Sequence, residues 1–158
     1  MEYLVTYGWA ILVIAIVIAA LFALGVFNNQ STPTVCLFPS DFGCLNSFVY
    51  ANGGLSINIQ QTYSPQINIT AIGCNTNKTT QDMLKVSPQI TLNAGANASI
   101  DGNLTQALKC YSGGNAYTSP VGTTFHGFIM LNYTNTQTGL KYTVVGQLTQ
   151  RIEGSNQT

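Results

Sequence analysis

The chain has 158 residues, a net charge of zero and charged side chains at only 6% of its positions. Soluble domains usually carry about a quarter charged residues, and nucleic-acid binding needs clustered Lys and Arg. The five basic residues here are scattered, which argues against nucleic acid as a partner, and the apolar content argues against a disordered chain.

The first 27 residues are predicted to form one long hydrophobic helix. From Trp9 to Phe27 every residue is apolar or Gly, and Glu2 is the only charge before Asp41. About 20 apolar residues suffice for a helix to cross a bilayer. A helix that is apolar on every face must be buried on every side, in lipid or in protein.

Three interpretations of this helix are open. A cleaved signal peptide needs a basic start and a short apolar core, but no Lys or Arg precedes Lys78 and the apolar run is long. A lipid-facing anchor fits the length and the hydropathy. The third interpretation is a helix that leaves the membrane and packs against copies of itself.

Two spacings favour packing between helices. Small residues four apart let helices approach closely, and residues seven apart suit long helices that pack nearly parallel. The first spacing is seen at Ala15, Ala19 and Ala23, and the second at Leu4, Ile11, Ile18 and Gly25.

Residues 28–34 are predicted to be a linker between the helix and one domain of residues 35–158. Asn28 follows the last apolar residue, where Asn commonly ends a helix, and Pro33 prevents the helix from continuing. The composition changes sharply here, from apolar to rich in Asn and Thr.

Four cysteines follow the linker: Cys36, Cys44, Cys74 and Cys110. Four cysteines allow three pairings, and disulfides are the usual outcome beside an export-type helix. We favour Cys36–Cys44, which closes a short local loop, and Cys74–Cys110, which ties two strand ends. Free thiols and a zinc site are the alternatives, but zinc sites usually place cysteines two to four apart.

The domain is predicted to be an antiparallel, Ig-like β-sandwich, which makes the chain α+β. Short alternating runs separated by turn residues indicate strands. The expected strands are residues 55–60, 67–71, 90–92, 104–110, 125–133 and 140–152. Residues 134–139 are expected to join the last two as a hairpin loop, with Gly139 available for a positive φ.

The sequence contains little that points to catalysis. His126 is the only histidine, and the carboxylates Asp41, Asp82, Asp101 and Glu153 form no recognised motif. Asp101 is expected to begin a turn rather than a calcium loop, which would need clustered oxygen ligands. We therefore expect no enzyme activity, no metal and no cofactor.

The triplet Asn-x-Ser/Thr, which is the acceptor for N-glycosylation, is unusually frequent. Random placement of the same residues would give about three such triplets, fewer than half of those present. They begin at Asn29, Asn68, Asn77, Asn97, Asn103, Asn132 and Asn156. We favour a glycosylated extracellular surface, although an Asn- and Thr-rich β domain can also contain many of these triplets through its composition alone.

The start of the chain resembles a known family. Glu2, Tyr3 and Leu4, followed by the Tyr-Gly-Trp-Ala run of residues 7–10 and the apolar helix, resemble archaeal type IV pilins with a class III signal peptide. The resemblance covers about 27 residues and a looser likeness in the β-rich remainder. The family has a short basic leader and usually places its glutamate at the fifth mature position, so the mature N-terminus of this chain is left open.

The resemblance implies a structural subunit of an extracellular archaeal type IV pilus, used for adhesion or surface attachment. Its partners would be copies of itself in a helical homopolymer, the membrane before assembly, a prepilin peptidase and the pilus assembly machinery. Glu2 would register one subunit on the next during assembly. The alternative is an extracellular β-sandwich binding protein that a single helix anchors in the membrane.

Overall fold

The computed structural model describes residues 2–24, 33–39, 41–62, 65–101 and 108–154, with side chains from Tyr7 onward. Two compact units make up the chain, Met1–Ser31 and Thr32–Thr158. The described part of the first is helical and that of the second is built from strands, so the chain is α+β.

The first unit contains helix α1, which spans Glu2–Ala23. At about 1.5 Å per residue the helix is about 33 Å long. Residues 25–27 of the predicted helix lie outside the described residues. In the part of the chain that the structure describes, no helix is both long enough and apolar enough to cross a membrane.

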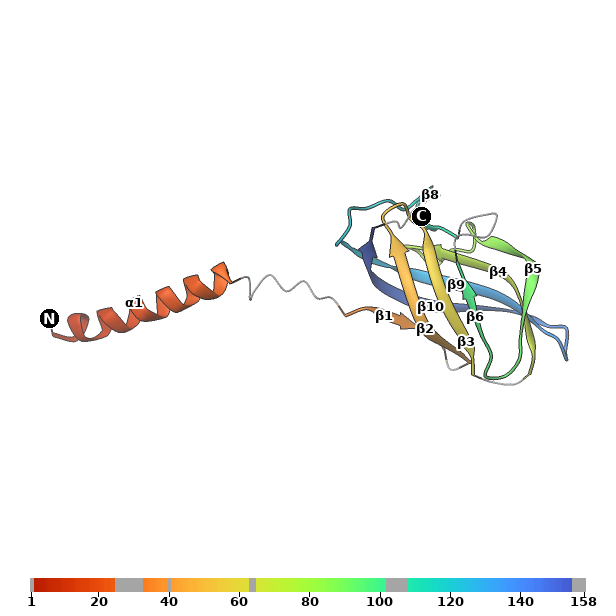
Figure 1. The fold of residues 1–158 in the computed structure, drawn as a ribbon, viewed down its shortest axis with the longest axis horizontal. Coiled ribbons are helices and arrows are strands. Elements are labelled where there is room, and N and C mark those ends of the chain that lie inside the picture. Colours follow the sequence, from red (N-terminus) through yellow and green to blue (C-terminus); the bar gives the residue numbers. More distant parts are fainter. Residues whose placement is uncertain (1, 25–32, 40, 63–64, 102–107, 155–158) are drawn as a thin grey trace. The chain divides into compact units, whose positions relative to one another are not determined.

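The second unit is a β domain, drawn in Figure 1. Its strands are β1 (Val35–Leu37), β2 (Phe42–Tyr50), β3 (Leu55–Gln61), β4 (Ile67–Asn75), β5 (Leu84–Leu92), β6 (Asn97–Ile100), β7 (Cys110–Ser112), β8 (Asn115–Ala116), β9 (Thr124–Asn135) and β10 (Lys141–Glu153).

These strands form one curled sheet in the order β6-β3-β2-β10-β9-β4-β7-β8, with β1 also paired to β10 and β5 to β4. Among the described strands, β10–β2 and β4–β7 are parallel pairs and the other pairs are antiparallel. Strand β10 joins β2 over only two residue pairs, at Ile152 and Glu153. The sheet therefore bends at this short junction.

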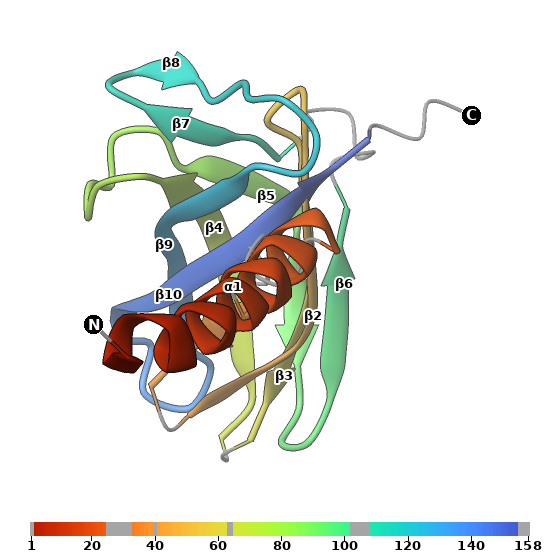
Figure 2. The ribbon, with the colours of Figure 1, turned by 90° about the vertical axis from the view of Figure 1, so that its left-hand side faces the viewer.

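The curl encloses the core of the domain. Figure 2 shows β2, β3 and β6 on one side of the domain and β4 and β9 on the other, with β10 running between them. Buried side chains from both sides belong to one cluster, which includes Ile57, Ile59, Ile69, Ile129 and Leu148. Because side chains alternate between the two faces of a strand, each alternating run supplies this cluster with every second residue.

Alternation in the last strand predicts that Tyr142, Val144, Gly146 and Leu148 share one face. This is confirmed for Gly146 and Leu148, whereas Tyr142 is exposed and Val144 is half-buried. Gly146, Leu148, Gln150 and Ile152 are buried, and the residues between them are exposed or half-buried. The hairpin before it is also confirmed: Gly139 has a φ of +70°, and its N–H donates to the carbonyl of Asn135 at 2.8 Å.

The other strand predictions were less complete. Strands β3, β4 and β9 lie where strands were expected, whereas β5 begins at Leu84, well before the expected run of residues 90–92. The expected strand of residues 104–110 falls mostly outside the described residues, and β7 begins only at Cys110. Strand β2 begins at Phe42, inside the segment between Cys36 and Cys44 where Pro39 and Gly43 indicate a loop, so the loop is shorter than these residues predict.

Candidate functional site

Helix α1 presents an apolar surface over all of its described faces. Trp9 and Ile11 are each 67% exposed, Phe22 is 64% exposed, and every described side chain from Ile11 to Ala20 is classed as exposed. No charged residue occurs between Tyr7 and Leu24. Because such a surface is unfavourable in water, the helix requires lipid or protein around it.

Two predicted features of the helix can be located. Ala15, Ala19 and Ala23 all lie within α1, where a spacing of four residues places them on one face. Glu2 is the first residue of α1, but its side chain lies outside the described side chains. The predicted assembly role of Glu2 thus stays a prediction.

Both favoured disulfides are formed. Cys36 and Cys44 are 8 residues apart in sequence, with Cα atoms 5.8 Å apart, and both are half-buried. The bridge attaches β1 to β2, and β1 also pairs with β10 from Val35 to Leu37. The first strand of the domain is therefore held by two other strands.

The second disulfide lies inside the core. Cys74 and Cys110 are 36 residues apart in sequence, their Cα atoms are 4.4 Å apart, and neither is exposed to solvent. The two residues are direct partners in the parallel pair β4–β7. The bridge thereby fixes a pairing that rests on only two residue positions. The cysteines form no free thiol and no zinc site.

The predicted glycosylation sites differ in their surroundings. Asn77, in the loop after β4, and Asn97, in β6, are exposed. Asn68 and Asn132 are half-buried in the sheet, where their Oδ1 atoms accept hydrogen bonds from Thr91 at 2.8 Å and from Thr143 at 2.7 Å. Asn29, Asn103 and Asn156 lie outside the described residues. Among the sequons that the structure describes, Asn77 and Asn97 are therefore the most accessible.

The remaining polar candidates are engaged in local structure. His126 is exposed on β9, with Nδ1 3.2 Å from the hydroxyl of Thr149. Asp82 accepts a hydrogen bond from Asn75 at 3.0 Å, and Asp101 accepts one from Ser56. Asp41 and Glu153 are both exposed. Among the described residues, no group of three or more His, Cys, Asp or Glu lies close enough to hold a metal ion.

One cluster was missed by sequence reasoning. Phe42, Tyr133 and Tyr142 come from β2, β9 and β10, and the ring of Tyr133 contacts those of both Phe42 and Tyr142. The alternating pattern of β10 predicts that Tyr142 shares a face with Gly146 and Leu148, but nothing in the sequence shows which aromatic residues it meets. No protein-family model and no curated protein matches this chain.

Proposed function

We propose that this chain is a structural subunit of an extracellular archaeal type IV pilus, which assembles through α1 into a helical homopolymer and serves adhesion or surface attachment. The observation that carries the proposal is the exposed apolar surface all around α1. The occupant that we assign to this surface is α1 of other copies of the chain.

Copies of α1 suit one another for three reasons. The Ala15, Ala19 and Ala23 face permits close approach of helix backbones. From Tyr7 to Leu24 the helix contains no charged side chain that packing would bury. A repeated head-to-tail contact whose rotation does not close produces an open helical filament, so a single surface suffices for unlimited assembly.

The β domain would then face the outside of the filament. Its own core and two disulfides give it stability without a contribution from the helix. Exposed sequons at Asn77 and Asn97 suit glycans that would keep a weakly charged surface soluble. We propose further that the curled sheet is an Ig-like β-sandwich, since a single core separates β6-β3-β2 from β9-β4.

The route to the filament follows from the same proposal. The chain would reside in the membrane before assembly, a prepilin peptidase would process it, and the pilus assembly machinery would extract it. The second candidate function is an extracellular binding protein with a single-helix membrane anchor, because lipid would cover the apolar face of α1 equally well.

Electron microscopy of sheared cell-surface material separates the two candidates. A pilus subunit should yield filaments whose main protein band is this chain, whereas an anchored protein should be recovered only in detergent-soluble membranes. The variant Glu2→Ala should be exported and folded but should form few or no filaments. It lacks the carboxylate that, in this proposal, sets the register of each subunit on the next.

Glu153→Ala is the matched control, since Glu153 is an exposed glutamate on β10. It should assemble normally. Normal filaments from Glu2→Ala would show that the carboxylate has no role in assembly, and the absence of any filament from the wild type would favour the anchor.

A further inference from the structure

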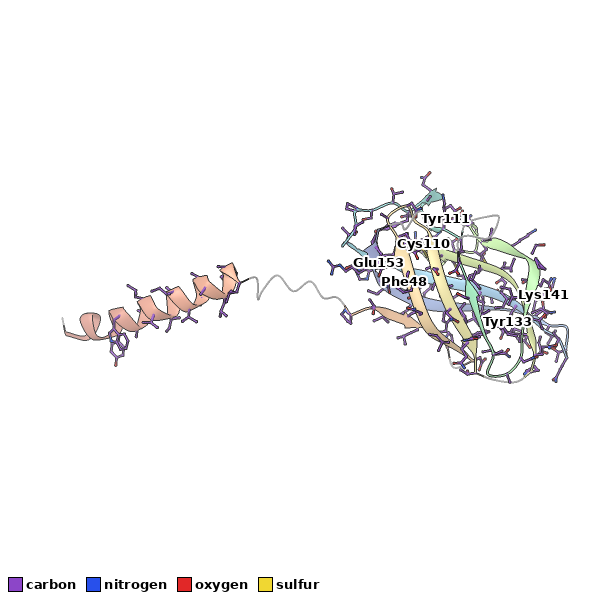
Figure 3. All side chains as sticks on the ribbon, in the orientation of Figure 1. Phe48, Cys110, Tyr111, Tyr133, Lys141 and Glu153 are labelled. Atoms are coloured by element: carbon purple, nitrogen blue, oxygen red, sulfur yellow. A yellow bond between two sulfur atoms is a disulfide. The ribbon has the colours of Figure 1, made fainter. Side chains whose placement is uncertain are left out.

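A cavity of about 300 Å³ opens at one end of the curled sheet. Three cross-strand pairs meet there: Phe42 with Gln61, Ile67 with Asn135, and Tyr133 with Tyr142. These residues lie where β2, β4 and β10 begin and where β3 and β9 end. Figure 3 shows Tyr133 and Lys141 at this end of the domain, away from Cys110 and Tyr111. The opening of the cavity is therefore surrounded by the ends of the strands that enclose the core.

Aromatic rings supply the apolar wall of this cavity. The ring of Tyr142 stacks on that of Tyr133, with centroids 5.4 Å apart and planes 24° apart, and Phe42 meets Tyr133 edge-on at 5.2 Å. Phe42 is buried, whereas Tyr142 remains 42% exposed. The stack therefore holds the Tyr142 ring in place while leaving part of its surface available to a ligand.

Polar groups surround the aromatic wall and are held in fixed orientations. The Asn135 Oδ1 atom accepts backbone N–H bonds from Gln137 at 2.9 Å and Thr138 at 3.2 Å. The Gln61 side chain, which is only 3% exposed, donates to the carbonyl of Pro65. The exposed carboxylate of Asp41 lies on the same cavity.

The Tyr133 hydroxyl adds a hydrogen-bond donor. Burial raises the pKa of Tyr133 above its usual value, and the Asp41 carboxylate and Tyr142 raise it further. The phenol thus stays protonated at neutral pH. The cavity combines a carboxylate acceptor, phenol donors and amides.

We propose that this cavity, which we call the Tyr133–Tyr142 pocket, is a binding site for one ring of a neutral saccharide. The apolar face of a sugar ring packs on an aromatic ring, and its hydroxyls exchange hydrogen bonds with carboxylate and amide groups. The volume lies at the small end of the range for ligand pockets, about 300–1,000 Å³, which suits a single ring rather than an extended chain.

Other ligand classes fit less well. No basic residue is among the described residues that line the pocket, so nothing there would balance a phosphate or a carboxylate. Sites for a quaternary ammonium group typically direct several aromatic faces at one point. Here Tyr133 and Tyr142 stack on each other instead, so their shared faces are not available to a cation.

The site would give the proposed pilus its means of attachment, but its existence does not depend on the filament. The Val35 end of β1 pairs at Thr149 of β10, seven residues from Tyr142 and about 23 Å along the strand. The pocket therefore lies far from the point where the chain enters the domain. The two proposals can fail separately, because binding can be measured on unassembled chains.

The test uses the full chain in a zwitterionic detergent, which has no sugar headgroup to compete. The probes are an array of neutral oligosaccharides and, by ligand-observed NMR, methyl glycosides of single hexoses and N-acetylhexosamines. We expect weak binding by the wild type, and a loss of about fivefold or more in affinity for Tyr142→Ala and for Asp41→Asn. Both positions are exposed, so neither substitution removes core packing.

Tyr111→Ala is the matched control, because it removes a tyrosine at the other end of the domain. Its affinity should equal that of the wild type, and circular dichroism should show the same fold for all variants. The proposal is overturned if no neutral saccharide binds, if Tyr142→Ala binds as well as wild type, or if tetramethylammonium binds in place of sugars.

Two sources could supply the saccharide, and two further probes distinguish them. Glycopeptides released from this chain test whether the pocket takes the glycans of neighbouring copies. Extracellular polysaccharide tests attachment to other surfaces. Binding of either probe that Tyr142→Ala abolishes supports the site and identifies its source, whereas binding that persists in Tyr142→Ala contradicts it.

Discussion

Removing the two disulfides should have clearly unequal consequences for the stability of the β domain. The perturbations are the double variants Cys36→Ser/Cys44→Ser and Cys74→Ser/Cys110→Ser. Both remove one bridge and add two hydroxyls, so they are chemically matched. They differ in the length of chain that the bridge closes and in the burial of its sulfur atoms.

The sizes of the two effects follow from these differences. In the chain-entropy treatment, a separation of 8 residues corresponds to about 2.5 kcal/mol and one of 36 residues to about 3.8 kcal/mol. Cys74 and Cys110 are also completely buried and directly opposite each other, so two serine hydroxyls there can share one hydrogen bond, and the donor left without a partner adds about 1–3 kcal/mol. Cys36 and Cys44 are half-buried and can exchange hydrogen bonds with water.

We therefore expect a loss of about 2.5 kcal/mol for the first variant and of about 5–7 kcal/mol for the second. Domains of this size have a total stability of about 5–15 kcal/mol, so the second variant should lie close to unfolding at room temperature. The first should remain folded, because its loss is a smaller fraction of the total.

Guanidinium unfolding of the full chain in zwitterionic detergent, followed by the circular dichroism of the β-sheet, measures both losses. Equal midpoints for the two variants, or a lower midpoint for Cys36→Ser/Cys44→Ser, would refute the reasoning from loop length and burial. Disulfide-intact wild type treated in the same detergent provides the reference.

Three further predictions follow from individual residues. Gly127→Ala should lower the free energy of unfolding by about 1–3 kcal/mol, because a β-carbon there would lie 2.6 Å from a ring carbon of Phe125 and 2.7 Å from the backbone oxygen of Asn75. Gly154→Ala is the control and should leave the unfolding midpoint unchanged, since a β-carbon at that position meets no atom within 4 Å. Peptide mapping of native material should find glycans at Asn77 and Asn97, and unmodified asparagine at both positions would contradict the glycoprotein proposal. The pKa of Tyr133 is higher in the folded than in the unfolded state. Its contribution to the free energy of unfolding is therefore complete below the unfolded-state pKa of about 10 and is lost as the pH rises through the folded-state pKa. Alkaline unfolding should accordingly begin at a higher pH in Tyr133→Phe, which has no phenol to ionise. If alkaline unfolding begins at the same pH in Tyr133→Phe as in the wild type, the raised pKa of Tyr133 is contradicted.

Sequence alone determined the parts of this protein in which the pattern is local. The apolar run predicted α1 because no charge interrupts it after Glu2. Alternation along β10 predicted that Gly146 and Leu148 share one face, and Gly139 marked the turn before the strand. The disulfide pairing could also be predicted, because one pair of cysteines is close in sequence and the other two cysteines lie at or next to predicted strands.

Only the tertiary structure decided which strands are neighbours. Periodicity shows which face a side chain occupies, but not which strand lies beside it, because pairing depends on contacts between residues far apart in sequence. Nothing local indicated that β10 would pair with both β1 and β2, or that β7 would lie parallel to β4.

The Tyr133–Tyr142 pocket depends on the same long-range pairings. Tyr133 and Tyr142 are adjacent because of the β9–β10 hairpin, which the sequence predicted. Asp41 and Phe42 join them only because the sheet curls until the start of β2 reaches the start of β10. That curl arises from strand twist and from burial of the shared core, which are properties of the whole domain rather than of any one segment.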